Sequence, residues 1–120
     1  MLELTFFDGK NEPEVISVSE NCYERLAQIG FDKKVEYKER TLTIEEEEYS
    51  VSAVKLTEAN RKVLLDLIEC ERQKELEKIF DHMDDNPTIK EMREALFYIK
   101  ELTMVYKCLK LNSNLYFSYE

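Results

Sequence analysis

The chain has 120 residues, of which 43% are hydrophobic and 36% are charged, and its formal net charge is -9. This length predicts a single domain over residues 1–120, large enough to bury a core without disulfides or a structural metal. The negative charge argues against direct binding to nucleic acid or to an anionic membrane, because both require basic contacts.

Acidic residues are concentrated in the first half of the chain. Residues 1–60 contain 7 Lys+Arg against 14 Asp+Glu, whereas residues 61–120 contain 10 against 12. The densest acidic stretch is the run of four consecutive glutamates from Glu45 to Glu48. Such an excess of negative charge favours solubility and association with a basic partner.

The cysteines indicate a reducing environment. Cys22, Cys70 and Cys108 are odd in number and far apart, so they predict neither a disulfide framework nor a zinc site. Each falls at an apolar helical position, where a free Cys behaves as a small hydrophobe, so we expect all three in the core. Neither a signal-peptide pattern nor an apolar run of ~20 residues is visible. We therefore expect a cytoplasmic protein.

A strand is predicted at the N-terminus. Apolar residues alternate over residues 2–7, and Asp8-Gly9 supplies a turn directly after them. Val15 and Ile16 predict a further short extended piece after Pro13.

The first helix is the best-marked element of the chain. Ser19 is a good N-cap, and Cys22 and Leu26 recur at the spacing of a buried helical face. Gly30 then stands where a left-handed C-terminal residue is expected, with Phe31 next to it and able to fold back on the helix. These residues predict a helix over residues 20–29 that ends in a Schellman motif.

Three short strands are predicted after this helix. Apolar and polar residues alternate over 34–38, 41–45 and 49–53, which predicts an antiparallel meander with one apolar and one polar face. The run from Glu45 to Glu48 falls at the turn between the second and third of these strands. Glu is disfavoured inside strands, and facing like charges are destabilising, so the run is either fully solvated or meets something positive.

Two long helices are predicted next. Thr57 is the expected N-cap of a helix over residues 58–83, which the segment Asp84-Asp85-Asn86-Pro87 ends. Thr88 opens a capping box that starts the following helix. Residues 95–109 are apolar nearly all round, so we expect this helix to be central in the fold. Its predicted core face comprises Met92, Leu96, Ile99, Thr103 and Tyr106.

The C-terminal segment has two interpretations. Residues 102–111 include β-branched side chains, and Asn112-Ser113-Asn114 could turn them into a strand at 115–119, which would make a terminal hairpin. No breaker follows Glu101, so we expect the helix to continue and the terminal strand to pair elsewhere in the sheet. The predicted fold is α+β in the order β-α-β-β-β-α-α-β, with a mainly antiparallel sheet packed against two long antiparallel helices.

Residues suited to catalysis are few. His82 is the sole histidine and lies within Asp81-His82-Met83-Asp84-Asp85. This cluster is interpreted either as part of a metal site or as a cation-capable residue at a helix C-terminus. The two glycines cannot build a phosphate-binding loop. The sequence therefore singles out no catalytic residue, metal ligand or cofactor, and it predicts a non-enzymatic protein.

The glutamate run is the candidate binding site. Glu45, Glu46, Glu47 and Glu48 either guard an edge hairpin against strand-to-strand aggregation or form a negative surface that covers a basic groove, as a nucleic-acid mimic does. In size, acidity and lack of catalytic groups, the chain resembles small inhibitors of the toxin-immunity and phage anti-defence types. This resemblance is one of properties and carries no residues over.

The functional expectation is a protein-binding module that occludes a basic surface of a partner protein, such as a nuclease or another nucleic-acid-handling protein. One alternative is a structural or regulatory homo-oligomer, such as a homodimer, that associates through the two long helices or through the terminal strand. A small-molecule or metal-dependent enzyme is the third hypothesis.

Overall fold

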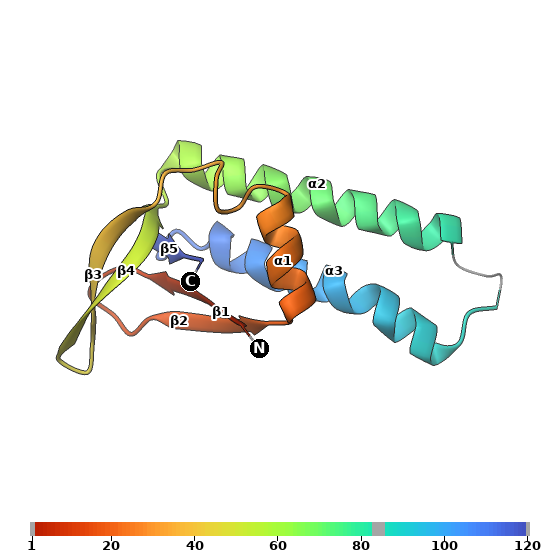
Figure 1. The fold of residues 1–120 in the computed structure, drawn as a ribbon, viewed down its shortest axis with the longest axis horizontal. Helices are drawn as coiled ribbons and strands as arrows, with labels where there is room; N and C mark the ends of the chain where they lie inside the picture. The colour runs from red at the N-terminus through yellow and green to blue at the C-terminus, as the bar shows by residue number, and fades with distance from the viewer. Residues whose placement is uncertain (1, 83–85, 120) are drawn as a thin grey trace.

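A computed structural model describes residues 2–82 and 86–119 of the chain. Within these residues a five-stranded sheet lies at one end of the molecule, and two long helices run side by side past it (Figure 1), so that the longest dimension is 54 Å. In chain order the elements are β1 (Leu2–Phe7), β2 (Glu14–Val18), α1 (Glu20–Gln28), β3 (Lys38–Ile44), β4 (Glu47–Lys55), α2 (Glu58–His82), α3 (Ile89–Lys110) and β5 (Tyr116–Ser118).

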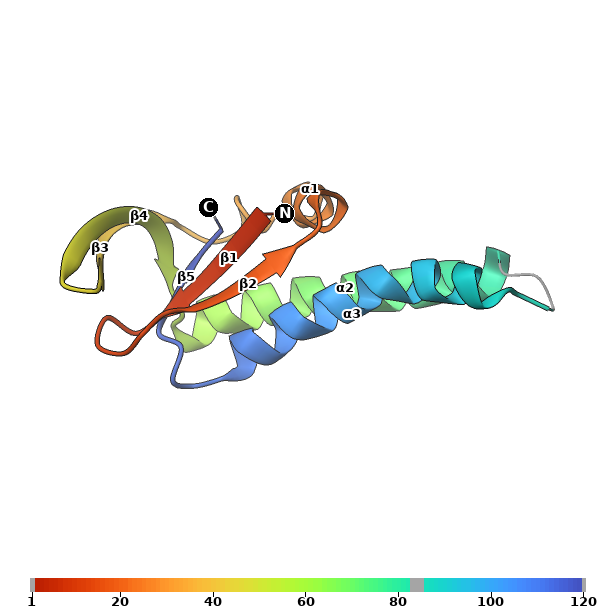
Figure 2. The same cartoon turned by 90° about the horizontal axis from the view of Figure 1, so that it is seen from below.

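The sheet and the helices form two layers. Figure 2 shows the sheet and α1 on one side of the α2–α3 hairpin, with the far end of the hairpin extending beyond both. The predicted α+β class, the antiparallel sheet and the two long antiparallel helices are confirmed.

The last strand of the chain lies in the middle of the sheet. The strand order is β2-β1-β5-β4-β3, and all four pairings are antiparallel. Phe117 of β5 pairs with Phe6 of β1 on one side and with Val54 of β4 on the other. The expectation that the terminal strand pairs elsewhere in the sheet is confirmed, and α3 continues to Lys110 without a terminal hairpin.

One strand lies elsewhere than predicted. The extended piece at Val15 and Ile16 is a full strand that pairs with β1 over five residues. In contrast, Val35 and Tyr37 lie in the segment between α1 and β3 and form no ladder. Val35 is buried in the core, and the Tyr37 hydroxyl donates to the Phe31 carbonyl oxygen at 2.6 Å. Val35 and Tyr37 therefore alternate with polar residues because both side chains pack toward the core from a loop. The prediction of a strand at 34–38 is wrong.

The helix caps are as predicted. The Ser19 hydroxyl accepts the Cys22 amide, and the Schellman bonds are present, with Gly30 at φ 100° and the Phe31 amide donating to the Leu26 carbonyl oxygen at 3.0 Å. Thr57 and Thr88 cap α2 and α3 in the same way, each accepting an amide three residues on. Residues 83–85, which include the predicted end of α2, lie outside the described residues.

The core lies between the sheet, α1 and the near halves of α2 and α3. From α3 it takes Leu102, Val105 and Leu109, all fully buried. The face predicted for this helix is wrong, because Met92 and Leu96 are exposed, Leu96 by 48%. The helix is central only in its C-terminal half, where the sheet and α1 cover it.

Candidate interaction site

The β3–β4 ribbon projects from the body of the molecule. β3 pairs with β4 from Lys38 opposite Ala53 to Ile44 opposite Glu47, but β4 pairs with β5 only at Val54 and Lys55. Residues 38–53 therefore form a two-stranded extension, here called the acidic arm, at the end of the molecule opposite the α2–α3 turn (Figures 1 and 2).

The glutamate run forms the tip of the acidic arm. The run lies at the hairpin turn, as predicted, and the two turn residues are Glu45 and Glu46, both with positive φ, 51° and 67°. Two-residue hairpin turns with both φ positive normally use Asn-Gly or Asp-Gly, because the Cβ atom of an ordinary residue is crowded in this region, whereas Gly has no Cβ and Asn and Asp tolerate the conformation. A Glu-Glu turn therefore places charge at the tip at a cost in backbone energy.

The other two glutamates carry the charge onto both faces of the arm. Glu48 lies opposite Thr43 and Glu47 opposite Ile44, so alternation sends their side chains to opposite faces. All four glutamates are exposed. Glu47 accepts the Tyr49 hydroxyl at 2.6 Å, and this hydrogen bond raises the pKa of Tyr49. The end of the arm thus carries exposed negative charge at its turn and on both of its faces.

The base of the arm is fixed to the sheet. Leu42 and Ala53 bury against Phe7 in a small apolar cluster. The Arg40 Nε atom donates to the Ala53 carbonyl oxygen at 3.1 Å, and its guanidinium lies 4.9 Å from the centre of the Tyr116 ring. These contacts pack the base of the arm against β1 and β5.

No metal-binding cluster accompanies the arm in the described residues. Among residues 2–82 and 86–119, no three or more His, Cys, Asp and Glu side chains converge as a metal site requires. His82 is exposed at the end of α2. Met83, Asp84 and Asp85, the rest of the predicted cluster, lie outside the described residues.

A partly buried ion network crosses from α1 to the two long helices. Arg25 Nη2 lies 3.0 Å from Glu71 Oε1 and 2.6 Å from Glu75 Oε2, and its guanidinium stacks 3.9 Å from the centre of the Tyr98 ring. The Tyr98 hydroxyl donates to Glu71 at 3.2 Å. Glu71 is therefore buried, and its helical spacing from Leu64 was the sequence signal that it shares the inner face of α2.

Two of the three thiols are buried as predicted. Burial raises the pKa of Cys22 and of Cys108 to about 12. For Cys108 the nearby Glu14 carboxylate adds to this rise, because it accepts the thiol at 2.7 Å. The prediction is wrong for Cys70, which lies on the outward side of α2 and is exposed.

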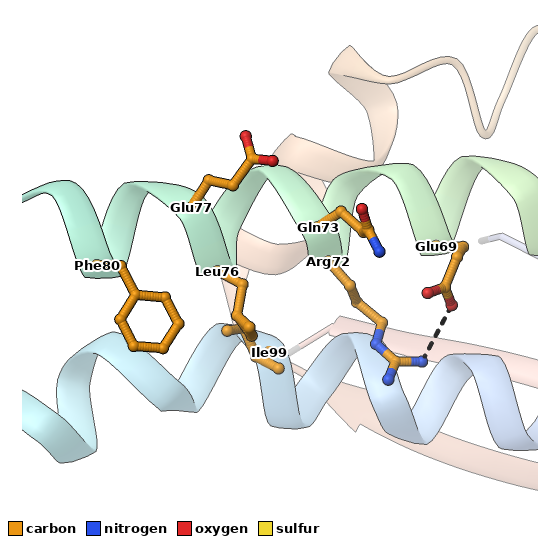
Figure 3. A pocket seen from close by; sticks show the side chains of 7 residues that line it. All are labelled: Glu69, Arg72, Gln73, Leu76, Glu77, Phe80 and Ile99. Atoms are coloured by element: carbon orange, nitrogen blue, oxygen red, sulfur yellow. Dashed lines mark ion pairs between the residues drawn. The ribbon is translucent and has the colours of Figure 1, made fainter.

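A second surface is an open groove on the face of the α2–α3 hairpin away from α1. Figure 3 views this face, with Leu76 and Ile99 directed toward each other across the two helices. The groove has a volume of about 470 Å³. Its lining residues are Glu69, Arg72, Gln73, Leu76, Glu77, Phe80 and Ile99.

Comparisons with known proteins identify no relative: no family model, curated protein or solved structure matches this chain. In the described residues, no helix is long and apolar enough to span a membrane. The acidic arm and the groove on the α2–α3 hairpin are therefore the features that bear on function.

Proposed function

We propose that the protein is a non-enzymatic, protein-binding inhibitor of the immunity or anti-defence type, whose acidic arm covers a basic, nucleic-acid-handling surface of a partner protein. The observation that carries this proposal is the Glu-Glu turn at the tip. Strained backbone in a folded protein is typical of positions where function outweighs local stability. A turn made for stability alone would place Gly or Asn here.

The shape of the arm supports the same function. A narrow ribbon with an exposed acidic tip can enter a groove that accommodates a nucleic-acid backbone, where lysine and arginine side chains are expected. Its fixed base limits the conformational freedom that binding would remove. In this proposal the protein acts in the cytoplasm with reduced thiols and contacts no nucleic acid itself.

The experiment has two steps. The tagged protein first identifies its partner by capture from its native host and mass spectrometry. Association kinetics are then compared for the wild type and a quadruple variant, in which Glu45, Glu46, Glu47 and Glu48 are all replaced by Gln. The variant keeps side-chain size and removes four charges. We expect its association rate to fall ~10-fold or more at low salt and the salt dependence to weaken.

A matched control removes the same charge from the body of the protein. Glu3, Glu24, Glu36 and Glu58 are exposed and lie outside the arm, so replacing these four by Gln gives an equal change in net charge. The control should retain most of the association rate. If both variants bind at the wild-type rate, and the tip variant instead aggregates on storage, the run is an edge guard and the proposal is wrong.

A further inference from the structure

The outer half of the α2–α3 hairpin has no core of its own. From Arg72 to His82 and from Ile89 to Phe97, no side chain is buried. The last buried positions before this part are Glu71 in α2 and Tyr98 in α3, at the level where α1 crosses the hairpin (Figure 1). In proteins most helical stability comes from the packing of an apolar face. In this outer half the two helices contact each other, but the described residues place no further layer over their apolar side chains.

The side chains that would contact such a layer are large and apolar. Phe80 is 78% exposed and Ile89 70%. A second groove runs along α3 and is lined by Ile89, Met92, Arg93, Leu96, Phe97 and Lys100. Leu96 and Ile99 are three residues apart on the helix, so this groove adjoins the one that Ile99 lines. Contiguous apolar surface of this kind marks an interaction site.

The charges at the edges of this surface have opposite signs on the two helices. Glu77 lies at the α2 edge, pointing away from α3 in Figure 3, whereas Arg93 and Lys100 line the groove on α3. Leu76 and Ile99 share one groove, so Glu77 and Lys100 lie at about the same level of the hairpin. Among the described residues, none of these three charged groups has an ion-pair partner within 4.0 Å.

We propose that a second copy of this chain covers the outer half of the hairpin, with a two-fold axis parallel to the helices. In this arrangement α2 of each copy lies over α3 of the other. Glu77 then meets Arg93 and Lys100 of the second copy, and all neighbouring helices are antiparallel, as in an up-down-up-down four-helix bundle. The same face of each copy carries negative charge on α2 and positive charge on α3. A two-fold axis therefore brings each charge opposite its counterpart, which is the self-complementarity that such an interface requires.

The remainder of each copy leaves this interface accessible. The sheet and α1 lie on the opposite side of the hairpin (Figure 2), so they would face outward on the two sides of the dimer. The acidic arm lies at the other end of the molecule and stays uncovered. The dimer therefore does not depend on the proposed inhibitory function, and either can fail without the other.

The first test is the mass of the full chain, measured by sedimentation equilibrium over a wide range of concentrations. The wild type should be a dimer. Leu96→Glu and Phe80→Ser should each raise the dimer dissociation constant ~100-fold or more, because both put polar atoms into the apolar centre. Val15→Glu is the matched control, since Val15 on β2 is exposed to the same 48% as Leu96, and it should remain dimeric.

The second test uses charge reversal. Glu77→Lys alone and the pair Arg93→Glu with Lys100→Glu should each weaken the dimer ~10-fold or more, since like charges then face each other. Mixing these two variants should restore a dimer, because each helix edge again meets its opposite charge. Circular dichroism checks that each variant is folded, and Phe80→Ser alters so exposed a side chain that its fold should survive.

Three results would overturn the inference. The first is a wild-type protein that stays monomeric at every concentration, whether or not its hairpin binds an amphipathic helix of another protein. The second is a dimer that Leu96→Glu and Phe80→Ser leave intact. The third is a dimer that the single-edge charge reversals do not weaken, which would rule out α2 lying over α3 of the second copy.

Discussion

Buried carboxylates show how single residues orient the elements of this protein. The Glu101 carboxylate, only 5% exposed, accepts the Ser19 amide at 2.6 Å and the Ser19 hydroxyl at 2.8 Å, and so ties the start of α1 to the middle of α3. Glu71 is held in the same region by Arg25. A buried charge is costly unless it is paired, so these contacts specify one position of α1.

The thiols give a prediction at this scale. In the native protein at pH 8, Cys70 should react with a thiol reagent, whereas Cys22 and Cys108 should be protected, because they are buried and their pKa values are raised to about 12. Absorbance with a chromogenic disulfide reagent should count one thiol in the native state and three after unfolding. Two or more fast native thiols would contradict the burial of Cys22 or Cys108.

The position of the core gives a second prediction. Leu26→Ala and Leu102→Ala should each lower the free energy of unfolding by ~2–5 kcal/mol, because both side chains are fully buried. Val15→Ala, at an exposed position on β2, should change it by ~0.5 kcal/mol or less. Urea unfolding followed by circular dichroism measures all three. A silent Leu102→Ala would show that the C-terminal half of α3 does not form the core.

At the scale of elements, the turn of the acidic arm tests the trade between charge and stability. Replacing Glu45 by Asn and Glu46 by Gly should raise the free energy of unfolding by ~1 kcal/mol or more, because the left-handed conformation costs roughly 1–2 kcal/mol per ordinary residue. Thermal and urea melts measure the gain. The same change should slow association with the partner, since it removes two tip charges.

A control separates the backbone effect from the charge effect. Glu45→Gln with Glu46→Gln removes the same two charges but keeps ordinary residues at positive φ, so it should gain much less stability than the Asn-Gly variant. Equal melting temperatures for the two variants would show that the turn is not strained by its side chains.

At the scale of the whole molecule, local stability should differ along the hairpin. Amides of the outer half (72–82 and 89–97) should exchange with solvent faster than those around Leu64 and Val105, which are fully buried. Raising the protein concentration should slow exchange in the outer half if the second copy covers it. Hydrogen exchange followed by mass spectrometry measures both. In the Leu96→Glu variant the dependence on concentration should vanish.

Structural features that depend on a few neighbouring residues could be predicted from the sequence alone. Ser19, Thr57 and Thr88 cap their helices as predicted, and Gly30 ends α1, because capping and turn energies depend on neighbours only a few residues away. The position of the glutamate run at a hairpin turn is also confirmed. The number and type of long elements follow from the same local patterns, and so does the α+β class.

Only the tertiary structure decided which face of each element is covered. Leu96 and Phe80 have the spacing of core residues but are exposed, because the sheet and α1 reach only the near half of the hairpin. Cys70 is exposed, and Glu71 beside it is buried because Arg25 of α1 approaches that side of α2. The periodicity of apolar residues shows that a helix has an apolar stripe, but whether that stripe is buried depends on which other elements pack against it. Those elements come from distant segments of the chain, so a local sequence pattern cannot predict their positions.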